Sequence, residues 1–192
     1  MWDSPVGNLF ASSIVRLRPQ DPPASSLAFV IALAVVDAIK QIAPHVAVTI
    51  KWPNDVLSKN GAKLCGMLLE RSDDAVVIGI GLNLVQHPAG LDRPVSNLTA
   101  LGANPPHPQA VTEMLADAFG VWTRRWRDLG LSNILQAWQG AAHPIGTALS
   151  VNLPSGEVCN GLYAGLSDDG ALQLRLADGT IRAIHAADVF MI

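Results

Sequence analysis

The chain has 192 residues, of which 49% are apolar and 15% charged, and its formal net charge is −3. At about 100–200 residues per domain, this length allows one domain, or one domain with a smaller second one. The composition excludes an intrinsically disordered chain, which would be charge-rich and poor in apolar residues. The slightly acidic balance argues against binding through a strong positive field, so we expect no nucleic-acid partner.

The sequence predicts a cytoplasmic protein. The richest apolar run, at 27–36, ends at Asp37 after ten residues. A membrane-spanning helix needs about 20, so this run predicts a buried core helix and no membrane partner. The residues after Met1 lack a basic segment followed by an apolar run, so we expect no secretory signal. Cys65 and Cys159 lie far apart and form no C-x-x-C pair, which is typical of buried thiols in a reducing compartment.

The N-terminal part alternates between strand and helix patterns. Apolar residues from Leu27 to Ile39 recur at helical spacing around most of the helix, which indicates a buried helix that Pro44 ends. Alternating β-branched residues before Pro53 indicate a strand. The predicted elements are a strand over 9–17, a helix from 25 or 26 to about 42, and strands over 46–52, 63–70 and 75–84.

Beyond a Pro-rich stretch at 89–107, the pattern is helical and then changes at Gly146. Amphipathic spacing predicts helices over 108–129 and 131–141. After Gly146, short alternating runs are separated by turn residues such as Asp-Gly, which are hairpin signals. These runs cover 147–153, 158–166, 171–176 and 180–185.

The predicted fold class is α+β, in two units. Residues 1–146 are expected to form the main domain, a mixed β-sheet with helices on one side. Residues 147–192, with short strands and tight turns, are expected to form a small SH3-like β-barrel. A helical 147–192 segment, or one woven into the main sheet, would contradict this division.

Charged and amide side chains cluster in two neighbouring segments, K-W-P-N-D-V and K-L-C-G-M-L. Lys51 and Lys63 suit the negative charge of a polyphosphate, and Asp55 suits a magnesium ion that bridges phosphate oxygens. Asn54 offers both a donor and an acceptor to a base or a phosphate. The alternative is an ordinary turn in which Asn54 and Asp55 cap the backbone and both lysines are solvated.

Two glycines occupy alternate positions of the apolar strand that ends in I-G-I-G-L-N. Gly79 and Gly81 leave one strand face without side chains, so a planar or fused-ring apolar ligand could approach the backbone closely there. Glycine used for helix packing is an equally good explanation of the pair. The segment is not a Rossmann fingerprint, because no third glycine opens a helix after it.

These segments, in this order and spacing, resemble the catalytic core of the biotin protein ligases. K-W-P-N-D-V, K-L-C-G-M-L and V-I-G-I-G-L-N-L resemble the family's motifs, and the residues at 2–9 resemble its W-x-S-P-x-G-N-L stretch. Trp138, the H-P-I-G sequence at 143–146 and A-D-V-F at 187–190 also agree with the family. The resemblance covers essentially the whole chain.

The resemblance implies a catalytic domain of the class II synthetase or biotin ligase type at 1–146, followed by the SH3-like barrel. Members bind biotin and ATP and form biotinoyl-AMP with release of pyrophosphate. They then transfer the biotinoyl group to one lysine of a biotin carboxyl carrier protein of a carboxylase. Fixed lysines and a magnesium ion offset the charge that builds on the phosphate oxygens, so no covalent enzyme nucleophile is needed.

The resemblance also implies a role for each motif residue. Lys63 is the expected catalytic residue, because it would reach both the biotin carboxylate and the α-phosphate. Asp55 would serve the nucleotide and its magnesium ion. The residues expected to bind ATP are Lys51, Asn54, Asp55 and Asn83. The residues expected to bind biotin are Lys63, Gly66, Met67, Leu68, Gly79 and Gly81.

The sequence departs from the family pattern at its start. Members carry a Gly-Arg-Gly-Arg-x-Gly loop before the W-x-S-P-x-G-N-L stretch, whereas here Met1 directly precedes Trp2. This loop closes over biotin and the adenylate, and such a lid excludes water from a hydrolysable mixed anhydride. Two alternatives to an active biotin ligase follow: a catalytically impaired protein that only binds its ligands, and a lipoate- or other acyl-transferring relative.

The same departure predicts an open sheet edge. Strands supplied by an upstream segment are expected to be absent beside Trp2 and the strand at 9–17. Because an unpaired edge exposes backbone donors and acceptors, we expect exposed apolar surface or a homodimer contact there.

Overall fold

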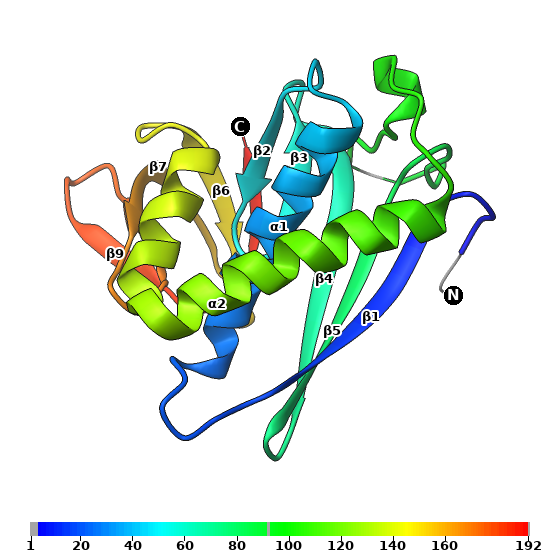
Figure 1. Ribbon diagram of the computed structural model, residues 1–192. Helices are drawn as coiled ribbons and strands as arrows, with labels where there is room; N and C mark the ends of the chain where they lie inside the picture. The colour runs from blue at the N-terminus through cyan, green and yellow to red at the C-terminus, as the bar shows by residue number, and fades with distance from the viewer. Residues whose placement is uncertain (1–3, 92, 192) are drawn as a thin grey trace.

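Five strands of the N-terminal part form one antiparallel sheet, in the order β1-β5-β4-β3-β2 (Figure 1). The computed structural model of the protein describes residues 4–91 and 93–191. The strands are β1 (Leu9–Arg16), β2 (Val48–Lys51), β3 (Asp55–Ser58), β4 (Lys63–Ser72) and β5 (Ala75–Leu82). Every neighbouring pair runs antiparallel, so this sheet is antiparallel rather than mixed, and the α+β class is confirmed.

β3 is a strand that the sequence pattern does not predict. It begins directly after the turn signal Pro53-Asn54, and all four of its residues are buried. A four-residue strand covered on both faces shows no alternation of apolar and polar side chains, which is the usual strand signal. Its pairing with β2 on one side and β4 on the other places it inside the sheet.

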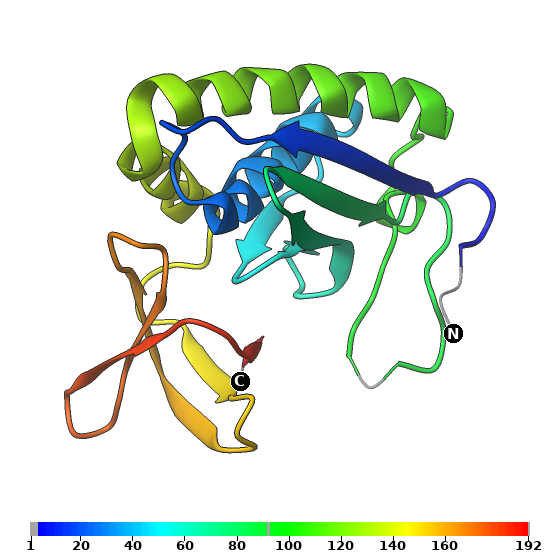
Figure 2. The same cartoon turned by 90° about the horizontal axis from the view of Figure 1, so that it is seen from below.

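Two long helices cover one face of this sheet (Figure 2). They are α1 (Leu27–Ile42) and α2 (Pro108–Ala141), with short 3₁₀ turns η1 (Ala24–Ser26) and η2 (Thr99–Leu101) elsewhere. Gly130, with a φ of 77°, divides α2 into two helical segments, which confirms the two predicted helices. Indole groups join the helices, since Trp122 Nε1 donates to Asp37 Oδ2 at 2.8 Å and Trp126 Nε1 donates to Ser26 Oγ at 2.7 Å.

The helical segment 24–42 is long enough and apolar enough to cross a membrane, judged by length and composition alone. In the fold, however, 67% of the tested window is buried, and Leu27, Ile31 and Ile39 have no exposed area. A core helix passes the same test, and the contacts of α1 with α2 and with three strands of the sheet agree with the predicted core helix.

The C-terminal part forms a second antiparallel sheet, which we call the C-terminal sheet. Its strand order is β10-β6-β7-β8-β9. The strands are β6 (Ala148–Asn152), β7 (Val158–Leu166), β8 (Leu172–Arg175), β9 (Ile181–Ile184) and β10 (Asp188–Met191). The first four agree with the predicted runs, whereas β10 is an additional strand. Within residues 93–191 no ladder joins β9 to β10, so the sheet is open rather than a closed barrel.

β1 is an outer strand of the first sheet and carries exposed apolar side chains. It pairs with β5 along its whole length, from Leu9 to Arg16. Phe10 is 39% exposed and Ile14 is 66% exposed. These positions agree with the predicted apolar surface at an open edge. Trp2 lies outside the described residues, and the homodimer contact stays a prediction.

Candidate ligand-binding site

Two lysines and one aspartate meet where three neighbouring strands begin or end. Lys51 is the last residue of β2, Asp55 the first of β3 and Lys63 the first of β4, and Lys51 pairs with Asp55 in register. Lys51 Nζ lies 3.2 Å from Asp55 Oδ2, and Lys63 Nζ forms an ion pair with Asp55 Oδ1. The sequence segment therefore forms one cluster, and the two lysines are not freely solvated as the alternative of an ordinary turn expects.

The cluster carries an excess of positive charge in a mostly buried setting. The Asp55 side chain is 6% exposed, and those of Lys51 and Lys63 are 14% and 21% exposed. One carboxylate cannot offset two ammonium groups. Because charges at partly buried positions are screened less than those at the surface, the remaining positive charge favours an anionic ligand here.

Glycines from two neighbouring strands lie side by side on the sheet face away from the helices. Gly66 of β4 pairs with Gly81 of β5, and Leu68 pairs with Gly79. Side chains alternate between the faces of a strand, so Gly66, Gly79 and Gly81 form one strip with little side-chain bulk, which Leu68 adjoins. Beside it, a Cβ added at Gly81 would lie 3.8 Å from the ring of Phe10 on β1. The strip can therefore admit a flat apolar ligand against the backbone.

A cavity of about 810 Å³ lies over this strip and reaches Lys63. It lies within the size range of small-molecule sites. The predicted site residues that line it are Lys63, Gly66, Met67, Leu68, Gly79, Gly81 and Asn83. The predicted residues outside its lining are Lys51, Asn54 and Asp55. Asp55 still joins the two groups, because it forms an ion pair with Lys63.

Met67 and Leu68 contribute to this cavity in different ways. Leu68 is 57% exposed and lies in the strip with Gly79, which suits an apolar wall. Met67 is 3% exposed and pairs with Ile80, whose side chain belongs to the buried core. Strand alternation places Met67 on the helix-covered face, so it supports the strip from behind.

The two asparagines of the predicted site hold the backbone around it. Asn54 Nδ2 donates to the carbonyl oxygen of Met67 at 2.6 Å, which ties the β2–β3 connection to β4. Asn83 Nδ2 donates to the carbonyl oxygen of Ser96 at 2.9 Å, and the Ser96 amide donates to the carbonyl oxygen of Lys63 at 3.0 Å. Through these bonds, both asparagines fix the segments next to Lys63.

Asn8 is a site-shaping residue that the sequence analysis does not single out. Its Oδ1 accepts hydrogen bonds from the amides of Leu84, Val85 and Gln86, at 3.0, 3.1 and 3.2 Å. Asn8 is 6% exposed and lines the cavity, so it fixes the chain that leaves β5. Its place in the W-x-S-P-x-G-N-L stretch is the sequence signal that points to it. Arg93 also lines the cavity, from the Pro-rich segment, without such a signal.

Cys65 adjoins the catalytic candidate, and its burial disfavours the nucleophilic thiolate form. Burial raises the pKa of its thiol to about 12, although nearby Lys63 acts in the opposite direction. The reactive form of cysteine is the thiolate, which is scarce at neutral pH in such a site. The ion-paired cluster at the site consists of the two lysines and Asp55, and Glu70 and Arg93 also line the cavity.

The residues around Asp55 do not fit a magnesium ion held by the protein. Magnesium is usually bound through one or two carboxylates together with substrate phosphates. Here both Asp55 oxygens already face ammonium groups. Over 4–91 and 93–191, no group of three His, Cys, Asp or Glu side chains is placed to hold a metal ion. In this site Asp55 therefore serves as the partner of the two lysines.

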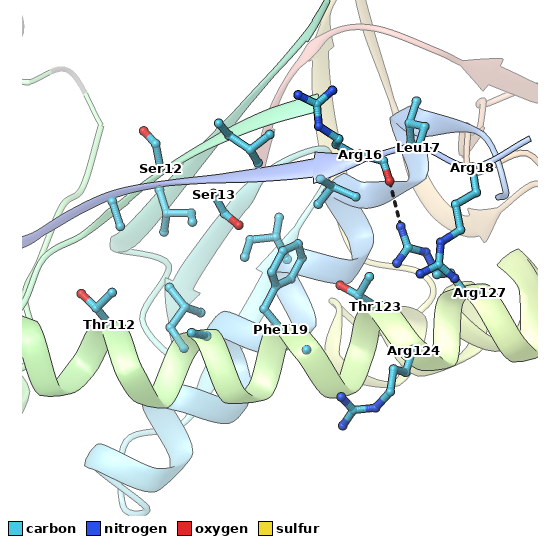
Figure 3. Close-up of a pocket in the computed structure, with 18 of the residues that line it drawn as sticks. Ser12, Ser13, Arg16, Leu17, Arg18, Thr112, Phe119, Thr123, Arg124 and Arg127 are labelled. Atoms are coloured by element: carbon cyan, nitrogen blue, oxygen red, sulfur yellow. Dashed lines mark hydrogen bonds between the residues drawn. The ribbon is translucent and has the colours of Figure 1, made fainter. Parts of the chain in front are cut away.

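A second cavity, of about 910 Å³, lies between β1 and α2 (Figure 3). Arg16, Arg18, Arg124 and Arg127 line it together with apolar side chains. Arg127 is held in place, since its Nη2 donates to the carbonyl oxygen of Arg16 at 3.0 Å and its Nε lies 3.1 Å from Asp21 Oδ1. The predicted site residues all lie outside this lining, so this cavity is distinct from the candidate site.

We expect His143 to make the free energy of unfolding of the protein depend on pH. Burial lowers its pKa from 6.5, and the nearby Lys51 ammonium adds to this effect. The unfolded chain then binds a proton more readily than the folded chain, so the free energy of unfolding falls as the pH drops below about 6.5. Once the pH is below the pKa of His143 in the folded protein, no further loss arises from this group. We expect His143→Gln to reduce this pH dependence.

The measurement is urea denaturation of both proteins at about pH 7.5 and about pH 5.5. His45→Gln, which changes an exposed histidine, serves as the matched control for the substitution itself. An unchanged pH dependence in His143→Gln would contradict the assignment.

The fold and the site define an α+β protein with a lysine-bearing cavity on its first sheet, followed by a small β-sheet unit. Residues 7–140 match the model of the biotin/lipoate A/B protein ligase family, and residues 148–191 match that of the biotin protein ligase C-terminal domain. The chain belongs to the biotin/lipoate A/B protein ligase family.

Named relatives support this family assignment. The chain is 38% identical to a biotin–[acetyl-CoA-carboxylase] ligase of Paracoccus denitrificans, over 98% of this chain and 82% of that protein. It is 32% identical to the bifunctional ligase/repressor BirA of Bacillus subtilis, over 98% of this chain and 60% of that protein. The chain thus spans between about three fifths and four fifths of the length of these two relatives.

Solved structures show the same fold. The biotin protein ligase of Aquifex aeolicus in complex with biotin and ATP superimposes with a TM-score of 0.86 at 20% identity, over 100% of this chain and 82% of that one. The biotin protein ligase of Leishmania major in complex with biotinyl-5-AMP gives a TM-score of 0.64 at 22% identity, over 96% of this chain and 81% of that one. The predicted family and fold are confirmed.

Proposed function

We propose that the protein is an ATP-dependent biotin ligase that joins biotin to a lysine of a biotin carboxyl carrier protein. The observation that carries the proposal is the position of Lys63. Its ammonium lies at the end of the glycine strip and forms an ion pair with Asp55, which also binds Lys51. A ligand with a flat apolar body and a carboxylate would place that carboxylate beside phosphate-binding lysines.

The first step joins the two substrates. A carboxylate oxygen of biotin attacks the α-phosphorus of ATP, the bond to the β-phosphate oxygen breaks, and pyrophosphate leaves. Lys63 would lower the repulsion between the carboxylate and the phosphate, and Lys51 would bind the phosphates. Such fixed charges, placed where negative charge develops, contribute strongly to catalysis.

The second step moves the acyl group. The neutral amine of the acceptor lysine attacks the acyl carbon of biotinoyl-AMP, AMP leaves, and the amine proton passes to solvent. Holding the acyl group and the amine together supplies much of the rate. Gly66, Gly79 and Gly81 would hold the ring system, with Leu68 beside it, while Asn54 and Asn83 would fix the nucleotide side.

We propose a carrier domain of an acetyl-CoA carboxylase as the acceptor, and the cytoplasm as the compartment. The names of the Paracoccus denitrificans and Mycobacterium tuberculosis relatives support the acceptor. Two buried free cysteines, Cys65 and Cys159, support a reducing compartment. The ligase names of these relatives favour this activity over the binding-only and the lipoate-transferring alternatives.

The test is labelling of a purified biotin carboxyl carrier domain by the chain, followed by mass spectrometry. We expect one biotinoyl group on one lysine, dependent on both ATP and biotin, and no labelling when that lysine is replaced by arginine. Biotin binding without any labelling would support the binding-only alternative. Preferential labelling with lipoate would support the lipoate-transferring one.

A further inference from the structure

The ammonium group of Lys51 is also held by the C-terminal sheet. Lys51 Nζ donates a hydrogen bond to the carbonyl oxygen of Val189 at 2.8 Å, across 138 residues of sequence. It also lies 5.8 Å from the ring centre of Phe190. Both partners belong to β10, whereas Asp55, the third partner, belongs to the first sheet. The ammonium group of Lys51 therefore has partners in both sheets.

β10 contacts the first sheet beside Lys51. Val189 is 2% exposed and pairs with Val151 of β6. Met191 reaches the β3–β4 turn, where a Cβ added at Gly61 would lie 3.2 Å from its Cε. Trp52, the next residue in the sequence, donates its Nε1–H to the carbonyl oxygen of Gly170 in the β7–β8 connection at 3.1 Å, in a buried contact. Together these contacts place the C-terminal sheet, with β10 in it, next to the end of β2.

A lysine side chain is flexible, so its ammonium group is ordered only where its surroundings hold it. Ordering such a side chain costs conformational entropy, and a group ordered in advance avoids that cost when a ligand binds. Asp55 attracts the ammonium from one direction, and the Val189 carbonyl and the Phe190 ring attract it from another. An aromatic ring face attracts a cation through its quadrupole.

We propose that β10 is a positioning element for Lys51, and that the Val189 carbonyl and the Phe190 ring place its ammonium for the phosphates of ATP. This inference rests on the proposed function, in which Lys51 binds those phosphates. It predicts that the affinity for ATP depends on a side chain of the C-terminal sheet, while the affinity for biotin does not. Phe190 is a positioning residue in this role, because it acts through Lys51.

Phe190→Leu tests the proposal, because it removes the ring and keeps an apolar side chain. Calorimetric titration of the full chain with ATP is expected to show about two- to five-fold weaker binding, the size of a cation–π contact at a partly exposed site. Biotin affinity and the urea midpoint are expected to be unchanged. Phe190→Tyr keeps a ring and is expected to restore ATP affinity. Ile181→Ala, at a site 58% exposed on β9, is the control and is expected to bind ATP normally.

A double-mutant cycle with Lys51→Ala separates positioning from a general effect on the fold. If Phe190 acts through Lys51, Phe190→Leu has no further effect on ATP binding once Lys51 is alanine. Equal weakening in both backgrounds, or none in the parent, would overturn the proposal and leave the proposed function intact. Parent-like ATP affinity in Lys51→Ala, or no ATP binding by the unmodified chain, would contradict the proposed function itself, and the inference would fall with it.

Discussion

Replacing Lys63 with alanine is expected to lower the rate of biotinoyl-AMP formation by at least about 10²-fold, the scale of losing one donor that stabilises developing charge. The ammonium of Lys63 lies at the cavity and is ion-paired with Asp55, so it is the positive charge best placed between a bound carboxylate and a phosphate. The measurement is single-turnover pyrophosphate release at saturating ATP and biotin.

Two further variants sharpen this test. Lys63→Arg is expected to restore the rate only in part, because a planar guanidinium does not replace a compact ammonium. Lys59→Ala changes an exposed lysine in the nearby β3–β4 turn and is expected to keep the parent rate. If Lys63→Ala forms biotinoyl-AMP at the parent rate, the assignment of the K-L-C-G-M-L segment fails.

Gly66→Ala is expected to lower the same rate strongly while leaving the stability of the fold almost unchanged. A Cβ at Gly66 would lie 2.9 Å from both Cε and Nζ of Lys63, which is too close, so the lysine end must move. That end is flexible, and the displacement is therefore cheap for the fold. A shift of about 1 Å in a group that positions reactants can reduce the rate by about 10²-fold.

The readouts are single-turnover pyrophosphate release and the urea midpoint. Gly140→Ala is the matched control, because an added Cβ there has no neighbour within 4 Å, and it is expected to leave the rate unchanged. A Gly66→Ala protein with the parent rate would mean that the position of the Lys63 ammonium does not limit the reaction. A large fall in the urea midpoint would point instead to damage of the sheet.

The longer elements are predictable from the sequence because their patterns extend over several turns or pairs. α1 shows apolar residues around most of its circumference, and β4 and β5 are long enough for a strand pattern. β3 is buried at all four positions, so it lacks the alternation of apolar and polar side chains that marks a half-buried strand. β10 has only one buried residue, Val189, among its four.

The site is predictable where its residues are close in sequence and hidden where packing brings them together. Lys51, Asp55 and Lys63 stand within one short segment, and the sequence correctly groups them. The pairing of Gly66 with Gly81 depends on the register of β4 against β5, which the sequence does not specify. The hydrogen bond from Lys51 to the carbonyl oxygen of Val189 joins residues 138 positions apart, and it depends on how the two sheets pack.

The measurement that tests the account most directly is biotin-dependent pyrophosphate release from ATP by the unmodified chain. The account predicts release that rises with biotin concentration to saturation, is absent without biotin, and is not supported by lipoate. It also predicts that the acid-stable product on an added carrier domain is biotin bound to one lysine. Saturable biotin binding without any pyrophosphate release would contradict the account.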